Sequence, residues 1–280
     1  MSTLMTVDEL ANAREAGKPV RVLDVRWRLD APDGTEAFRA GHIPGAVYVD
    51  LDRELADHSL PVAHGRHPLP TASALQESAR AWGVCDGDTV VVYDDLGNMS
   101  SARAWWLLKH AGIEDVRVLD GAFAAWKRAG LPVERGDGTA PIPGNVVLEY
   151  GAMPVLTARE AAAIARSGSL VDARAGERYR GEVEPIDPRA GHIPGALSAP
   201  TNGNLDADGS FLAVDALRRR FADAGVDPAA PVGAYCGSGV TASHTVLALH
   251  LAGIPAALYP GSWSEWSRDP DAPVATGEQP

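Results

Sequence analysis

The chain has 280 residues, of which 45% are hydrophobic, and a net charge of −12 at pH 7. This length suits about two domains, and the acidic balance argues against a broad surface for nucleic acid or anionic membranes. Only two cysteines occur, Cys85 and Cys236, which excludes a disulfide framework and favours a reducing, cytoplasmic compartment.

No targeting or membrane-spanning segment is expected. Residues 1–10 carry neither the basic region nor the apolar core of a signal peptide. The longest apolar stretch, near residues 246–254, is interrupted by His250 and Gly253 and is too short to span a bilayer.

Short apolar runs alternate with helical patterns along the first half. The expected strands are residues 20–25, 89–93 and 116–119, and the expected helices include residues 71–82 and 100–110. In the second half, an apolar run at residues 231–235 precedes a helical pattern that begins at Thr241. This alternation predicts an α/β fold with a mainly parallel sheet flanked by helices.

The two halves are related by an internal duplication. Gly-His-Ile-Pro-Gly-Ala at residues 41–46 recurs at residues 191–196, and a Thr-x-x-Glu capping box opens each half, at Thr6 and Thr157. We therefore expect two similar α/β domains. Their predicted bounds are 1–135 and 154–280, with a Gly- and Pro-rich linker at 136–153.

A cysteine loop distinguishes the second half from the first. Cys236 follows an apolar run and begins the sequence Cys-Gly-Ser-Gly-Val-Thr-Ala, whereas Asp94 holds the matching position in the first half. Glycines let the backbone turn with several N–H groups pointing inward, and a helix beginning there adds its own unpaired N–H groups. We expect Cys236 to be a nucleophilic thiolate, so the second half carries the reaction and the first is a partner domain.

These motifs resemble those of the tandem-domain rhodanese family of sulfurtransferases. The resemblance spans residues 10–266 and rests on the doubled Gly-His-Ile-Pro-Gly-Ala and the loop at 236–242. Arg-Tyr-Arg-Gly-Glu at 178–182 and Pro-Gly-Ser-Trp at 260–263 add to it. It implies two rhodanese-like α/β domains, the first non-catalytic and the second catalytic.

The loop itself resembles that of the 3-mercaptopyruvate sulfurtransferases. Thiosulfate-using relatives place basic residues directly after the cysteine, and here Gly237 and Ser238 carry no charge. The resemblance implies a catalytic serine, histidine and aspartate beside the cysteine, namely Ser238, His67 and Asp52.

The same resemblance implies how the donor is bound. Arg178 would grip its carboxylate, and the loop and the first helical turn, Gly237, Gly239, Val240 and Thr241, would bind through their N–H groups. Some relatives carry a second arginine after the Glu-Pro of this segment. Here Glu184-Pro185 is followed by Ile186 and Asp187, and whether Arg189 substitutes stays open.

The implied reaction transfers sulfur from 3-mercaptopyruvate to a thiol or cyanide acceptor through a persulfide on Cys236. It involves a small anionic donor and an acceptor such as thioredoxin. No cofactor, metal, nucleic acid or membrane is expected to take part.

Three alternatives remain beside this function. The first is a thiosulfate:cyanide sulfurtransferase that uses the same cysteine. The second is a cysteine phosphatase, which needs an arginine six residues after the cysteine, where Ala242 stands. The third is a sulfur carrier fed by a partner protein, which would not need a proton relay.

Other polar residues have simpler interpretations. His42 and His192 lie in the repeated turn and are expected to be structural. Arg26 and Arg174 are expected to pair with local carboxylates. His67 has His58 and His64 nearby, but they lack the ligand spacing of a zinc site.

Overall fold

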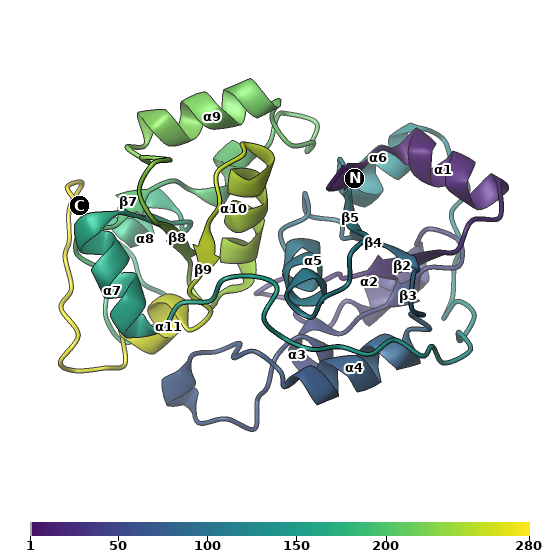
Figure 1. Ribbon diagram of the computed structural model, residues 1–280, viewed down its shortest axis with the longest axis horizontal. Helices are drawn as coiled ribbons and strands as arrows, with labels where there is room; N and C mark the ends of the chain where they lie inside the picture. The colour runs from purple at the N-terminus through teal and green to yellow at the C-terminus, as the bar shows by residue number, and fades with distance from the viewer. Residues whose placement is uncertain (1) are drawn as a thin grey trace. The chain divides into compact units, whose positions relative to one another are not determined.

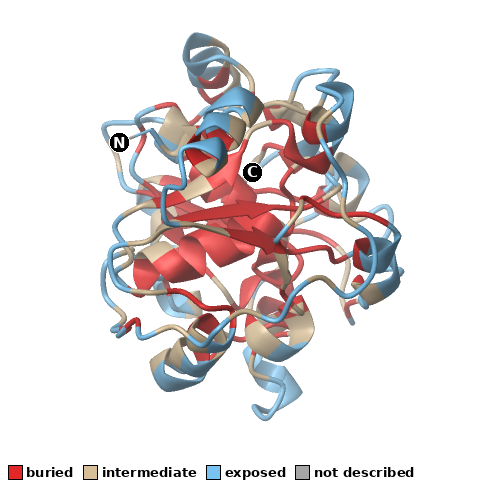
Figure 2. Ribbon diagram, turned by 90° about the vertical axis from the view of Figure 1, so that its right-hand side faces the viewer, coloured by how far each residue is buried: buried red, intermediate tan, exposed pale blue. Residues whose placement is uncertain are grey.

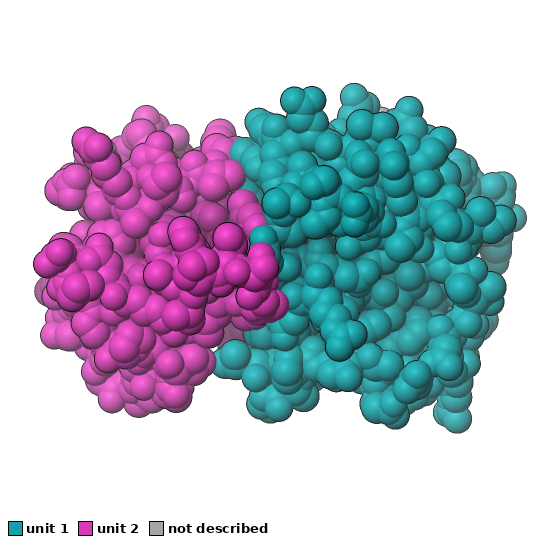
Figure 3. Space-filling view, turned by 90° about the horizontal axis from the view of Figure 1, so that it is seen from below, with its two compact units in different colours: residues 1–57, 70–153, 205–211 teal, residues 58–69, 154–204, 212–280 magenta. Residues whose placement is uncertain are grey.

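The computed structural model describes residues 2–280, which divide into two compact units (Figure 3). Unit 1 contains the residues up to 57, residues 70–153 and residues 205–211. Unit 2 contains residues 58–69, 154–204 and 212–280. The predicted bounds at 135 and 154, with their linker, remain a sequence-based assignment.

Unit 1 is built on a five-stranded sheet with the order β1-β5-β4-β2-β3, in which every pairing is parallel (Figure 1). The strands are β1 (Leu4–Met5), β2 (Val20–Asp24), β3 (Val47–Tyr48), β4 (Thr89–Tyr93) and β5 (Val116–Leu119). The helices are α1 (Val7–Glu15), α2 (Thr35–Ala40), α3 (Leu51–Glu54), α4 (Ala72–Ala81), α5 (Ser101–His110) and α6 (Ala122–Arg128).

Unit 2 has a four-stranded sheet with the order β7-β6-β8-β9, again parallel throughout. The strands are β6 (Ser169–Asp172), β7 (Leu197–Ser198), β8 (Val232–Tyr235) and β9 (Ala257–Leu258). The helices are α7 (Ala158–Ser167), α8 (Gly176–Tyr179), α9 (Val214–Asp223), α10 (Val240–Leu251) and α11 (Ser262–Trp266), with short 3-10 helices η1 (Val62–His64) and η2 (Thr201–Asn204).

Each sheet is buried because its strands are apolar on both faces. In unit 1, β4 is buried from Val90 to Tyr93, and in unit 2 all of β8 is buried. Figure 2 shows the central strands as buried, while the outward faces of the helices are exposed. Parallel strands covered on both sides read as continuous apolar runs. The predicted α/β fold class, with mainly parallel sheets flanked by helices, is confirmed.

The repeated turn performs the same structural task in both units. The His42 ring stacks on Phe38 with centroids 3.7 Å apart, and the His192 ring stacks on Tyr179 at the same distance. Each Nδ1 lies within hydrogen-bonding distance of the backbone oxygen of its stacking partner, at 2.9 and 2.7 Å. Both histidines are fully buried, which confirms the prediction that they are structural.

Buried ion pairs also repeat at the ends of the central strands. Arg26 Nη2 lies 2.8 Å from Asp24 Oδ2, and Arg174 Nη2 lies 2.6 Å from Asp172 Oδ2. Burial raises the pKa of Asp24 to about 6, although the neighbouring Arg26 acts to lower it. The two arginines therefore pair with local carboxylates, as predicted.

The predicted linker contains no helix or strand and packs along unit 1. Gly144 N donates to Arg80 O at 2.7 Å, and Glu149 N donates to Ala111 O at 3.2 Å. Across residues 2–280, none of the helices combines the length and the apolar character that crossing a bilayer requires.

The duplicated motif offers a matched pair of glycine substitutions. A Cβ at Gly195 (φ +87°) would lie 2.4 Å from Ala165 O, whereas a Cβ at Gly45 (φ +70°) meets nothing closer than Arg14 Nη2 at 3.6 Å. We expect Gly195→Ala to lower the free energy of unfolding by about 3 kcal/mol and Gly45→Ala by about 1 kcal/mol. Calorimetric melting of the two variants measures this difference, and equal losses would contradict it.

Candidate active site

The cysteine loop connects a central strand of unit 2 to a long and mostly buried helix. β8 ends at Tyr235, residues 236–239 turn, and α10 begins at Val240 with Gly239 as its N-terminal cap. Parallel α/β sheets bind ligands beyond the carboxyl ends of their strands. The four loop residues and the first turn of α10, with Val240 and Thr241, occupy this edge of the sheet.

The two glycines of the loop have different surroundings, and only Gly239 is required by its backbone conformation and the space around it. Gly239 has φ +80°, and a Cβ there would lie 2.5 Å from Pro260 O. A Cβ at Gly237 would lie 2.9 Å from Arg66 Nη2. Gly239 permits the tight backbone turn, and Gly237 leaves room for a guanidinium group to approach the main chain.

The sulfur of Cys236 is held by the backbone of its own loop. The N–H of Gly239 donates to Cys236 Sγ at 3.1 Å, and the Cys236 carbonyl accepts from Trp263 N at 2.9 Å. Cys236 is only 2% exposed. An N–H pointing at the sulfur, at the start of a buried helix, stabilises negative charge on that atom.

Ser262 is a site residue that the sequence analysis did not identify. Its Oγ accepts from Cys236 N at 3.1 Å and donates to Tyr259 O at 2.9 Å, so it ties the cysteine to the turn before α11. Ser262 has φ +53°, and Ala122, its counterpart in unit 1, has φ +55°. The sequence contained a sign of this role, because Gly121-Ala122 and Gly261-Ser262 align in the duplication and only the second pair carries a hydroxyl.

Two of the predicted proton-relay residues, Ser238 and His67, lie in unit 2 and contact each other. His67 Nδ1 lies 2.7 Å from Ser238 Oγ, and both side chains are buried. Asp52 belongs to unit 1, where it lies in α3 and its Oδ1 accepts from Trp27 Nε1 at 3.0 Å. The histidine and serine thus form a hydrogen-bonded pair in unit 2, and the role of Asp52 stays a prediction.

Two guanidinium groups approach the main chain beside the cysteine. Measured from the Cβ position that Gly237 would have, Arg66 Nη2 is 2.9 Å away and Arg178 Nη1 is 3.5 Å away. Arg178 Nη2 donates to Glu184 Oε1 at 2.6 Å. Arg66 is a second residue that sequence reasoning missed, although it directly precedes the predicted His67.

Arg189 binds the C-terminal segment of unit 2. Its guanidinium donates to four backbone carbonyls, including Trp266 O at 2.9 Å and Ser267 O at 2.8 Å. These four hydrogen bonds occupy the Arg189 guanidinium within the C-terminal segment. Arg189 anchors the C-terminal segment, and Arg66 supplies the second cation beside the loop.

The corresponding loop in unit 1 is filled by its own carboxylate. Asp94 accepts hydrogen bonds at 2.8 to 3.0 Å from four backbone N–H groups, those of Leu96, Asn98, Ser100 and Ser101. Burial raises the pKa of Asp94, and the four N–H groups act to lower it. A loop of this kind therefore binds an anionic group in unit 1, at the position where unit 2 has Cys236.

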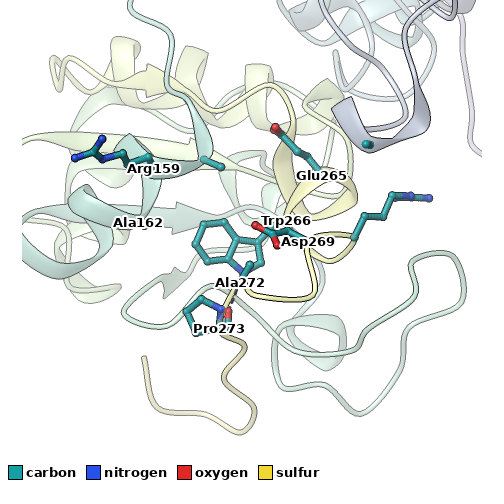
Figure 4. Close-up of a pocket in the computed structure, with 10 residues that line it drawn as sticks. Arg159, Ala162, Glu265, Trp266, Asp269, Ala272 and Pro273 are labelled. Atoms are coloured by element: carbon teal, nitrogen blue, oxygen red, sulfur yellow. Dashed lines mark hydrogen bonds between the residues drawn. The ribbon is translucent and has the colours of Figure 1, made fainter.

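A separate cavity of about 550 Å³ opens in unit 2 between α7, α11 and the C-terminal segment. Figure 4 shows the Trp266 ring at its centre, with Ala272 and Pro273 beside it and Glu265 above. Arg268 also lines this cavity, but residues 236–239 do not. The cysteine loop and this cavity are thus distinct features of unit 2.

Comparison with known proteins gives a consistent result over nearly the whole chain. The family model described as "Rhodanese-like domain" matches twice, at residues 6–129 and 157–269. "Putative thiosulfate sulfurtransferase SseB" of Mycobacterium tuberculosis is 50% identical over 98% of this chain and 97% of its own length. "Probable 3-mercaptopyruvate sulfurtransferase" of Pseudomonas aeruginosa is 46% identical over 98% of both chains.

A solved structure agrees with these sequence matches. The crystal structure of SseA from Escherichia coli, described as a 3-mercaptopyruvate sulfotransferase with the rhodanese fold, superimposes with a TM-score of 0.83 at 31% identity. The match covers 94% of this chain and 99% of that one.

The filled loop of unit 1 yields a stability prediction. Asp94→Ala leaves four N–H groups, three of them buried, without this acceptor, so we expect it to lower the free energy of unfolding by about 3 kcal/mol or more. Asp95→Ala is the neighbouring control, because the ion pair of Asp95 is with the half-exposed Arg28 and its loss should cost less than about 1 kcal/mol. Urea unfolding of both variants measures this, and similar losses would refute the anion-binding interpretation.

Proposed function

Because the chain belongs to the rhodanese-like domain family, we propose that it is a sulfurtransferase that moves sulfur from 3-mercaptopyruvate to a thiol through a persulfide on Cys236. Family membership confirms the resemblance drawn from the sequence. The observation that carries the proposal is the loop N–H of Gly239 on Cys236 Sγ, with the Ser238–His67 pair in the same loop environment.

The first half-reaction transfers one sulfur atom. The Cys236 thiolate attacks the sulfur of mercaptopyruvate, the S–S bond forms, and the donor's C–S bond breaks. The electron pair of that bond passes to carbon as pyruvate enolate, which becomes pyruvate when it gains a proton. Ser238, hydrogen-bonded to His67, supplies that proton, and Asp52 is the proposed orienting group for the histidine.

The donor's carboxylate meets the two guanidinium groups beside Gly237. Arg178 is the predicted ligand, and Arg66 adds a second cation at the same loop. Their side chains keep 17% and 18% of their surface exposed, whereas Cys236 is nearly buried. A small anion therefore passes these arginines on its way to the sulfur, and the burial keeps bulk water from the persulfide.

The loop N–H groups would then hold the persulfide. Residues 237 and 239–241 are the proposed binding residues, acting through their main chain. The four N–H groups that surround Asp94 in unit 1 support this role, since they stabilise an anion in the equivalent loop.

The second half-reaction returns the enzyme to its starting state. An acceptor thiolate attacks the outer sulfur, and Cys236 leaves as a thiolate, so the two halves follow ping-pong kinetics. A protein thiol such as thioredoxin, or cyanide in an assay, is the proposed acceptor. The two free cysteines favour a reducing compartment, so we place the protein in the cytoplasm.

Thiosulfate is the second candidate donor. The relative from Mycobacterium tuberculosis, at 50% identity, carries a thiosulfate sulfurtransferase name. Attack on thiosulfate releases sulfite, a leaving group that needs no proton. The two donors therefore place different demands on Ser238 and His67.

Mass spectrometry of the intact protein tests the proposed function. After mercaptopyruvate is added, we expect the wild-type chain to gain one sulfur atom on Cys236. Cys236→Ser should gain none, because the remaining Cys85 lies outside the loop. A gain only from thiosulfate would replace the proposed donor, and a gain from neither donor would overturn the sulfurtransferase assignment.

Variants of the hydrogen-bonded pair test the proton relay. Ser238→Ala and His67→Asn should lower kcat with mercaptopyruvate by about 10²- to 10⁴-fold, because the enolate loses its proton source. Turnover of thiosulfate should fall much less. Steady-state kinetics with cyanide as common acceptor measure both, and equal losses for the two donors would show that the pair does not deliver a proton.

A further inference from the structure

A single buried carboxylate in unit 2 contacts three guanidinium groups. Asp187 Oδ1 pairs with Arg66 Nη1 and lies 3.2 Å from Arg268 Nη1, and its Oδ2 lies 3.5 Å from Arg178 Nη2. The Asp187 side chain has no exposed surface. Two of these three arginines are the ones whose guanidinium groups approach Gly237, beside the reactive sulfur.

Arg66 and Arg178 approach Gly237, and the carboxylates of Asp187 and Glu184 pair with them. Arg66, Arg178 and Arg268 keep 18%, 17% and 23% of their side-chain surface exposed, while Glu184 keeps 3%. Arg66 Nε is buried and has no hydrogen-bond partner among the described residues. An anion at Gly237 would therefore lie beside two guanidinium groups, while the carboxylates paired with them are buried.

The charges of this cluster nearly cancel. Three guanidinium groups stand against the carboxylates of Asp187 and Glu184, which leaves one positive charge. Arg174 also touches Glu184, at 3.4 Å, but is balanced by its own partner Asp172. One net positive charge matches a donor with a single negative charge, such as mercaptopyruvate, better than a dianion such as thiosulfate.

We propose that Asp187 sets donor specificity by limiting the positive charge beside Cys236 to one. This inference rests on the proposed sulfur-transfer function. Asp187 acts through Arg66 and Arg178 and does not touch the donor. Removing its charge would leave a net positive charge of two on the cluster. This change would favour the dianion more than the monoanion, because the electrostatic attraction grows in proportion to the charge of the ligand.

Asp187→Asn is the direct test, because it keeps the size and one acceptor oxygen and removes the charge. We expect the ratio of kcat/KM for thiosulfate to that for mercaptopyruvate to rise by about tenfold, mainly through KM, and to rise less in high salt. Asp187→Glu, which restores the charge, should keep the ratio near the wild-type value.

Two further variants make the test independent of net charge and of folding. Asp215→Asn removes a charge from an exposed pair with Arg218 on α9, and it should leave the ratio unchanged. Arg268→Met removes a positive charge that pairs with Asp187, so the ratio should fall. If Asp187→Asn does not melt cooperatively, the donor ratio of Arg268→Met alone tests the role of Asp187.

The outcomes separate this inference from the proposed function. A folded Asp187→Asn protein with the wild-type donor ratio, or an Arg268→Met protein whose ratio does not fall, overturns the role of Asp187. If the wild-type chain uses thiosulfate only, the proposed donor is wrong. The thiosulfate KM then still tests Asp187, since it should fall in Asp187→Asn and rise in Arg268→Met.

Discussion

The site depends on one backbone arrangement, the turn that aims the Gly239 N–H at Cys236 Sγ. That turn exists because Gly239 adopts φ +80° in a place where a Cβ would meet Pro260 O. The buried strand β8 fixes one end of the loop and the buried helix α10 fixes the other. The chemistry of the cysteine therefore follows from a conformation that the surrounding fold enforces.

Comparison of the two units shows what the duplication has kept and what it has changed. Both retain the parallel sheet, the stacked histidine of the repeated turn and the buried arginine–aspartate pair. At the loop they differ, because Asp94 fills its own ring of N–H groups while Cys236 presents a sulfur. The loop of unit 1 holds its own carboxyl group, and the loop of unit 2 is proposed to receive an anion.

Sequence patterns predicted the sheets and the cysteine loop well, because both depend on local signals. Continuous apolar runs define buried parallel strands, and the glycines beside Cys236 mark a tight turn. The contributions of Arg66 and Asp187 could not be found in this way. They lie 121 residues apart in the sequence, and only folding brings their side chains together on one side of the loop. Ser262 was visible in the aligned repeats, but its hydrogen bond to Cys236 required the three-dimensional turn.

A crystal structure of the chain after brief exposure to 3-mercaptopyruvate tests the central claim most directly. The account predicts one additional sulfur atom bonded to Cys236 Sγ, within hydrogen-bonding distance of the N–H groups of residues 237–241. An unmodified Cys236, with the donor or its sulfur bound at another residue, would contradict it.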